Sequence, residues 1–63
     1  MATVEHIEPG VIRVSGEYNT VYVLSVYREY EANVYEVINT NEHVYGTVET
    51  VEAGIELASE FAD

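Results

Sequence analysis

Residues 20–39 read TVYVLSVYREYEANVYEVIN, and this stretch decides the fold. It is rich in valine and tyrosine, which favour β-strands because they pack well on a pleated, half-buried surface. We expect a strand over residues 20–30, a three-residue hairpin connection at residues 31–33, and a second strand over residues 34–39. The first half of the longer strand is apolar at both odd and even positions, which indicates a central strand or a subunit contact.

Two shorter strand patterns flank this hairpin in the sequence. Residues 11–15 follow the chain-breaking pair Pro9-Gly10, and their alternation places Ile12 and Val14 on one face. Residues 43–49 form the other strand, after a run of turn residues at 39–42. We expect the N-terminal segment, residues 1–9, to be loosely ordered.

Residues 51–62 have the periodicity of an amphipathic helix, with Thr50 as its N-cap. Gly54 is expected to cost about 1 kcal/mol relative to alanine in this helix, unless it allows close packing on the sheet. The apolar stripe is expected at Val51, Ile55, Ala58 and Phe61 or Ala62, with Leu57 at its margin.

These elements predict an α+β fold, in which a small antiparallel meander of three to four strands carries one C-terminal helix on one face. We expect a single domain over residues 1–63. A chain of this length buries only about 60% of the surface that its unfolded form exposes. It has no cysteine and therefore no disulfide to reinforce a marginal core. Small scaffolds of this kind often depend on a partner subunit, and a homodimer is expected.

The charge is the most unusual global property of the chain. Twelve acidic residues face two arginines and no lysine, which gives a formal net charge of -10. Nucleic acids and anionic membranes bind basic surfaces, so direct binding to either is not expected. The first residues lack the basic and apolar regions of a signal peptide, and no apolar run has the length of a membrane helix. A cytoplasmic protein is expected, or one in the host cytoplasm if it is viral.

Motifs for catalysis, cofactors and metals are not found. His6 and His43 have acidic neighbours, but their spacing matches no zinc or EF-hand pattern. No serine lies in a G-x-S-x-G elbow, and the glycines are too dispersed for a phosphate-binding loop. We therefore expect neither an enzyme nor a protein that holds a cofactor or a metal.

The tyrosines and nearby glutamates are the best candidates for a binding surface. Tyrosine is enriched at protein interfaces, although it also fills half-buried positions in ordinary strands. The central hairpin concentrates both residue types on two adjacent strands. The predicted partner-binding residues are Tyr22, Tyr27, Tyr30, Tyr35, Glu29, Glu31 and Glu36.

Two interpretations of the acidity remain open. In the first, the carboxylates imitate nucleic-acid phosphates, and the protein binds and occludes a basic surface of a protein partner. In size and charge the chain resembles small acidic inhibitors that phages and mobile elements direct against restriction and CRISPR systems. In the second, the charge is a salt adaptation, and the lack of lysine resembles proteins of salt-accumulating archaea. Mimicry should gather carboxylates on one face, whereas adaptation should spread them.

A further resemblance concerns the fold alone. A hairpin followed by TVEAGIELASEF (residues 50–61) resembles the arm-type DNA-binding module of phage integrases, in which a threonine caps a helix rich in glutamate and alanine. The resemblance covers less than half of the chain and implies a sheet-plus-helix fold. The basic sheet face that such a module uses for DNA is missing, so the resemblance implies no function.

Overall fold

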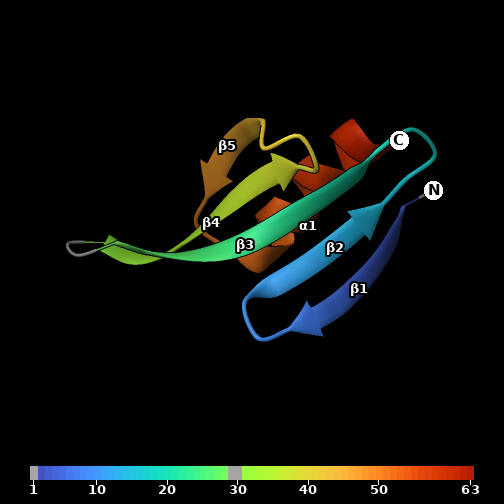
Figure 1. Cartoon of the computed structure of the whole chain (residues 1–63). Helices are drawn as coiled ribbons and strands as arrows, with labels where there is room; N and C mark the ends of the chain where they lie inside the picture. The colour runs from blue at the N-terminus through green and yellow to red at the C-terminus, as the bar shows by residue number, and fades with distance from the viewer. Residues whose placement is uncertain (1, 29–30) are drawn as a thin grey trace.

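The computed structural model describes residues 2–28 and 31–63, with only the backbone described for residues 27, 28 and 31–33. It is an α+β fold with a C-terminal helix, as predicted (Figure 1). The sheet has five strands and not the three to four that were predicted. In chain order the elements are β1 (Thr3–Glu8), β2 (Val11–Ser15), β3 (Thr20–Arg28), β4 (Glu31–Asn39), β5 (Val44–Val48) and α1 (Val51–Ala62).

The additional strand is β1, which lies within the N-terminal segment that was expected to be loosely ordered. It pairs antiparallel with β2, and all six of its residues are exposed. Gly10 turns the chain from β1 into β2 with a φ of 83°, and its carbonyl accepts a hydrogen bond from the Ser25 N–H of β3 (2.8 Å). Backbone hydrogen bonds to β2, and not buried side chains, therefore hold this strand in place. For this reason the side-chain pattern of residues 3–8 gives little indication of a strand in the sequence.

Each strand pairs antiparallel with the next, so the sheet is a meander with β3 at its centre. The expected hairpin connection at residues 31–33 is wrong, because these residues begin β4 and Glu31 pairs with Arg28. Pairing with β3 overrides the weak strand preference of Ala32 and Asn33. The far ends of β3 and β4 extend beyond β2 and β5 (Figure 1).

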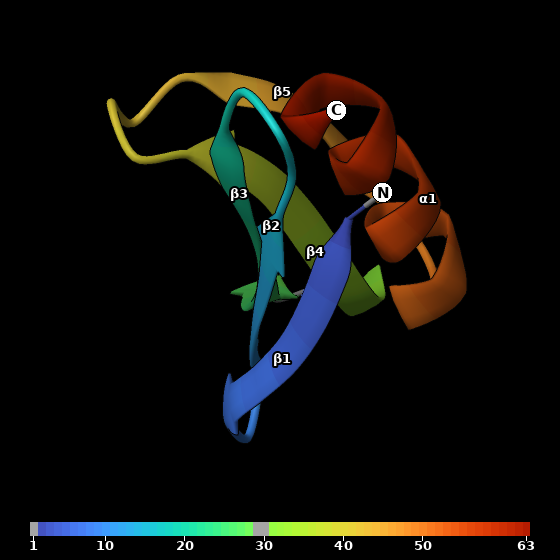
Figure 2. The same cartoon turned by 90° about the vertical axis from the view of Figure 1, so that its right-hand side faces the viewer.

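The helix covers one face of the sheet, and the core lies between the two layers (Figure 2). Val21 and Val23 of β3 face the helix and are 0% and 1% exposed. The odd positions of β3 are therefore core positions of a central strand and not a subunit contact. The other buried members of this core are Ile12, Val14, Val37, Ala58 and Ala62.

The helix begins at the predicted N-cap, where Thr50 Oγ1 accepts a hydrogen bond from the Ala53 N–H (3.1 Å). Its innermost line is Gly54, Ala58 and Ala62. Ala58 and Ala62 were expected there, whereas Val51 and Ile55 of the expected stripe are only half-buried. Small residues on this line bring the helix axis close to the sheet, so the larger side chains spread to the flanks. Phe61 is accordingly 41% exposed, and its ring stacks on Tyr45 with centroids 4.0 Å apart.

The β2–β3 turn caps the other end of the helix. The N–H groups of Tyr18 and Asn19 both donate to the Ala62 carbonyl (3.0 and 3.1 Å), and the Asn19 side chain donates to the Phe61 carbonyl. A side chain at Gly16 would collide with the backbone of Ala62, so only glycine lets the turn approach this closely. These contacts satisfy helix carbonyls that have no partner within the helix.

The close approach of the helix predicts that Gly54→Ala destabilises the fold. The added methyl group would lie 2.7 Å from Val23 Cγ1 and 3.3 Å from Val48 Cγ2. We expect a loss of about 1–3 kcal/mol in the free energy of unfolding, although alanine favours an isolated helix by about 1 kcal/mol. Chemical denaturation followed by circular dichroism measures the change.

Gly46→Ala is the control, because its methyl group would meet Leu57 Cδ2 at 3.7 Å, an ordinary contact. A Gly54→Ala protein as stable as the wild type would show that the helix does not pack as closely as described.

Candidate protein-binding face

The sheet has a second face, opposite α1, that no described element covers. Strand register assigns its residues, because directly paired residues share a face and successive residues alternate. Tyr22 pairs with Arg13 and Ile38, while Leu24 pairs with Val11 and Glu36. We call this surface the open face. Its apolar residues are Val11, Tyr22, Leu24, Val26, Val34, Ile38 and Val44. Of these, Val44 is exposed, Val34 is buried at 9% exposure, and the others are half-buried.

The open face is unusually apolar for an uncovered sheet surface. An antiparallel sheet with one face in water normally alternates apolar residues inside with polar residues outside. Here β3 is apolar on both sides, since Tyr22, Leu24 and Val26 on the open face alternate with Val21 and Val23 in the core. Val44 of β5 continues the surface and is 44% exposed. This composition resembles the centre of a protein interface.

Arg13 carries the cationic charge at one side of the open face. Its guanidinium donates to the Glu5 carboxylate of β1 (3.0 Å), and both side chains remain substantially exposed. The hydrogen bond and charge of Glu5 raise the pKa of Arg13 above its usual high value, and the Tyr22 hydroxyl contributes less. Arg13 is therefore charged at any ordinary pH. Glu36 of β4 pairs with Leu24 of β3. Its negative charge therefore lies on the other side of β3 from Arg13.

The predicted site residues fall into three groups. Tyr22 and Glu36 share the open face. Tyr35 lies on the α1 side, where it packs against the core. Glu29 and Tyr30 lie outside the described residues, as do the side chains of Tyr27 and Glu31.

Sequence reasoning did not select the aliphatic residues of this face, Leu24, Val26 and Ile38. The alternation had already placed Leu24 and Val26 on the same side as Tyr22. Alternation along one strand does not give the register between strands, and it does not show which face of the sheet the helix covers.

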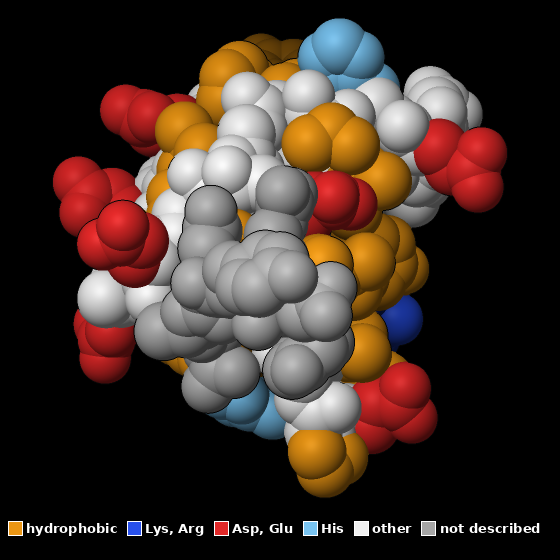
Figure 3. All heavy atoms as spheres, turned by 90° about the vertical axis from the view of Figure 1, so that its left-hand side faces the viewer, with side chains coloured by type: hydrophobic (Ala, Val, Ile, Leu, Met, Phe, Trp, Pro, Cys, Tyr) orange, Lys and Arg blue, Asp and Glu red, His pale blue; other side chains and the backbone are white. Residues whose placement is uncertain are grey.

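The described carboxylates do not gather on one face. Glu52, Glu56 and Glu60 lie one turn apart on the exposed side of α1, and Glu17, Glu42 and Glu49 lie in connections between elements. Figure 3 shows this arrangement, with a band of hydrophobic side chains on the open-face flank and carboxylates standing out along the helix flank. The described carboxylates therefore form no single acidic face.

No family model, curated protein or solved structure matches this chain. Within residues 2–28 and 31–63, no helix is long and apolar enough to cross a membrane. In the same part of the chain, no three histidine or acidic side chains are grouped so that they could hold a metal ion. The geometry of the two sheet faces is therefore the guide to function.

The row of glutamates on α1 predicts a salt-dependent gain in stability from Glu56→Gln. Like charges at i, i+4 destabilise a helix by about 0.2–0.5 kcal/mol each, and Glu56 has such neighbours on both sides. We expect a gain of about 0.5 kcal/mol at low salt that disappears above about 1 M salt, where the Debye length is about 3 Å. Denaturation at both salt concentrations measures it.

Glu42→Gln removes the same charge from the β4–β5 turn, where there are no helical neighbours, and should give a smaller gain. An equal gain from Glu56→Gln at low and high salt would contradict an electrostatic origin.

Proposed function

We propose that this chain is a small, non-catalytic binding module that recognises a protein partner through the open face. The observation that carries the proposal is the apolar surface of β3 and β4, where Tyr22, Leu24 and Ile38 are half-buried and no described element covers them. Contiguous apolar surface of this kind is costly in water, and on soluble proteins it commonly marks an interaction site.

The partner that suits this module has a basic surface around an apolar centre. Its cations would meet the carboxylates that surround the open face, which include Glu36 and Glu8. The net charge of -10 would accelerate encounter with such a partner by electrostatic steering. If the basic surface is one that binds nucleic acid, the bound module would occlude it and act as an inhibitor.

A homodimer is the second candidate, and one observation favours it. The open face carries Arg13 on β2 and Glu36 on β4, with β3 between them. In a two-fold interface the same patch meets itself, so the arginine of each copy can face the glutamate of the other. The helices and their carboxylates would then point outwards, which agrees with acidity as a salt adaptation of an archaeal or viral protein.

Site-specific photocrosslinking tests both candidates. We would place p-benzoylphenylalanine at Leu24, on the open face, and at Glu56, on the exposed side of α1, as the control position. Irradiation of cells that produce the protein, followed by mass spectrometry, identifies what lies against each position. We expect an adduct from position 24, with a basic protein if the first candidate is correct and with a second copy if the second is. Equal or absent adducts at both positions would contradict both candidates.

Charge reversal then tests the nature of the partner. Changing Glu29, Glu31 and Glu36 together to Lys should abolish the adduct with a basic partner. Changing Glu52, Glu56 and Glu60 to Lys alters the net charge equally but leaves the open face intact, so it should reduce the adduct far less. An adduct that survives the first triple change would show that the carboxylates of the central hairpin do not recognise the partner.

A further inference from the structure

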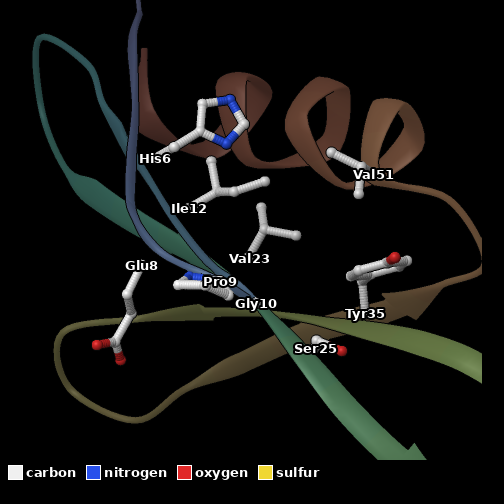
Figure 4. A pocket seen from close by; sticks show the side chains of 9 residues that line it. All are labelled: His6, Glu8, Pro9, Gly10, Ile12, Val23, Ser25, Tyr35 and Val51. Carbon is white, nitrogen blue, oxygen red and sulfur yellow. The ribbon is translucent and has the colours of Figure 1, made fainter.

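A pocket of about 500 Å³ lies on the α1 side of the sheet, between the β1–β2 hairpin and the first turn of α1 (Figure 4). Ile12 and Val23 form its floor, and Val51 of α1 contributes to one wall. The rings of His6 and Tyr35 stand on opposite sides of that floor. The volume falls within the range of about 300–1,000 Å³ typical of small-molecule sites.

Small residues keep this end of the core hollow. Val21, Val23 and Ser25 are the successive positions of β3 that face α1, and the third of them is a serine where the first two are buried valines. Gly10 lies against Ser25, and a Cβ on Gly10 would already be 3.3 Å from the Ser25 Cβ. Since α1 begins only at Val51, no helical side chain fills the remaining space.

The lining and the charge together select the class of ligand. The floor suits an apolar body, and the face of the Tyr35 ring suits a cationic group through cation–π attraction. Arg13 lies on the open face, so among the described side chains no lysine or arginine lines the pocket and opposes a cation there. The Glu8 side chain points away from the floor and adds to the negative field outside it. Glu52, in the first turn of α1, offsets the positive end of the helix dipole.

We propose that this pocket binds a small organic cation, with its apolar body on the floor of Ile12 and Val23 and its ammonium group against the ring of Tyr35. The site is on the opposite side of the sheet from the open face, so it is independent of the proposed partner and is tested separately.

The test uses three probes of nearly equal shape: phenethylamine, 2-phenylethanol and phenylacetate. Each is titrated into the ¹⁵N-labelled protein at low salt and followed by NMR. We expect saturable shifts at His6, Ser25, Tyr35 and Val51, with the amine bound about tenfold more tightly than the acid and the alcohol between them. Equal affinities for amine and acid would overturn the cationic class. If phenethylamine changed only the chemical shifts of the exposed glutamates of α1, the proposed location of the site would be wrong.

A pocket-filling variant separates the site from general attraction of cations to an acidic protein. Ser25→Leu should occupy the hollow and abolish the saturable shifts. Thr47→Leu is the matched control, because Thr47 is an exposed residue that pairs with Glu36 on the open face. Ser25→Gly, which leaves the hollow open, should retain binding and covers the case in which Ser25→Leu fails to fold. Undiminished binding to a folded Ser25→Leu protein would contradict the proposal.

Discussion

The structure depends on how closely α1 approaches the sheet at Gly54. Because Gly54 has no side chain, the helix backbone packs directly against Val23. Ala58 and Ala62 continue this contact towards the β2–β3 turn. That turn then holds the helix end through the Ala62 carbonyl. A 63-residue chain without disulfides has little other core, so the valines of β2, β3 and β4 under this one helix provide most of its apolar burial.

A core built on one side leaves the other side of the sheet uncovered. The chain nevertheless places Tyr22, Leu24 and Ile38 there, in the middle strands, where polar residues would suffice for a free surface. The described carboxylates lie on the helix and in the connections, and Glu5, Glu8 and Glu36 lie on the open face around its apolar centre. The open face therefore has an apolar centre with charged residues around it, as protein interfaces do.

Much of the secondary structure could be predicted from the sequence, because residues close together in the chain indicate where the strands and the helix begin. Thr50 marked the start of the helix, Pro9-Gly10 marked the start of β2, and the turn residues at 39–42 marked the start of β5. Gly54 was expected to weaken the helix unless it allowed close packing on the sheet, and the helix does pack closely there. The missed features depend on non-local pairing. β1 is held by the backbone of β2, residues 31–33 follow the register of β3, and Phe61 is displaced to the flank because smaller residues occupy the contact. The two faces of β3 were both apolar, so only the position of the helix could distinguish core from open face.

The most direct test of the central claim, that another protein covers the open face, is carbene footprinting in intact cells and on the dilute purified chain. Tyr22 lies on the open face, and Tyr18, which is 77% exposed in the β2–β3 turn, is an internal reference. We expect labelling of Tyr22 to fall several-fold in cells while labelling of Tyr18 is unchanged. The same ratio of Tyr22 to Tyr18 labelling in both samples would contradict it.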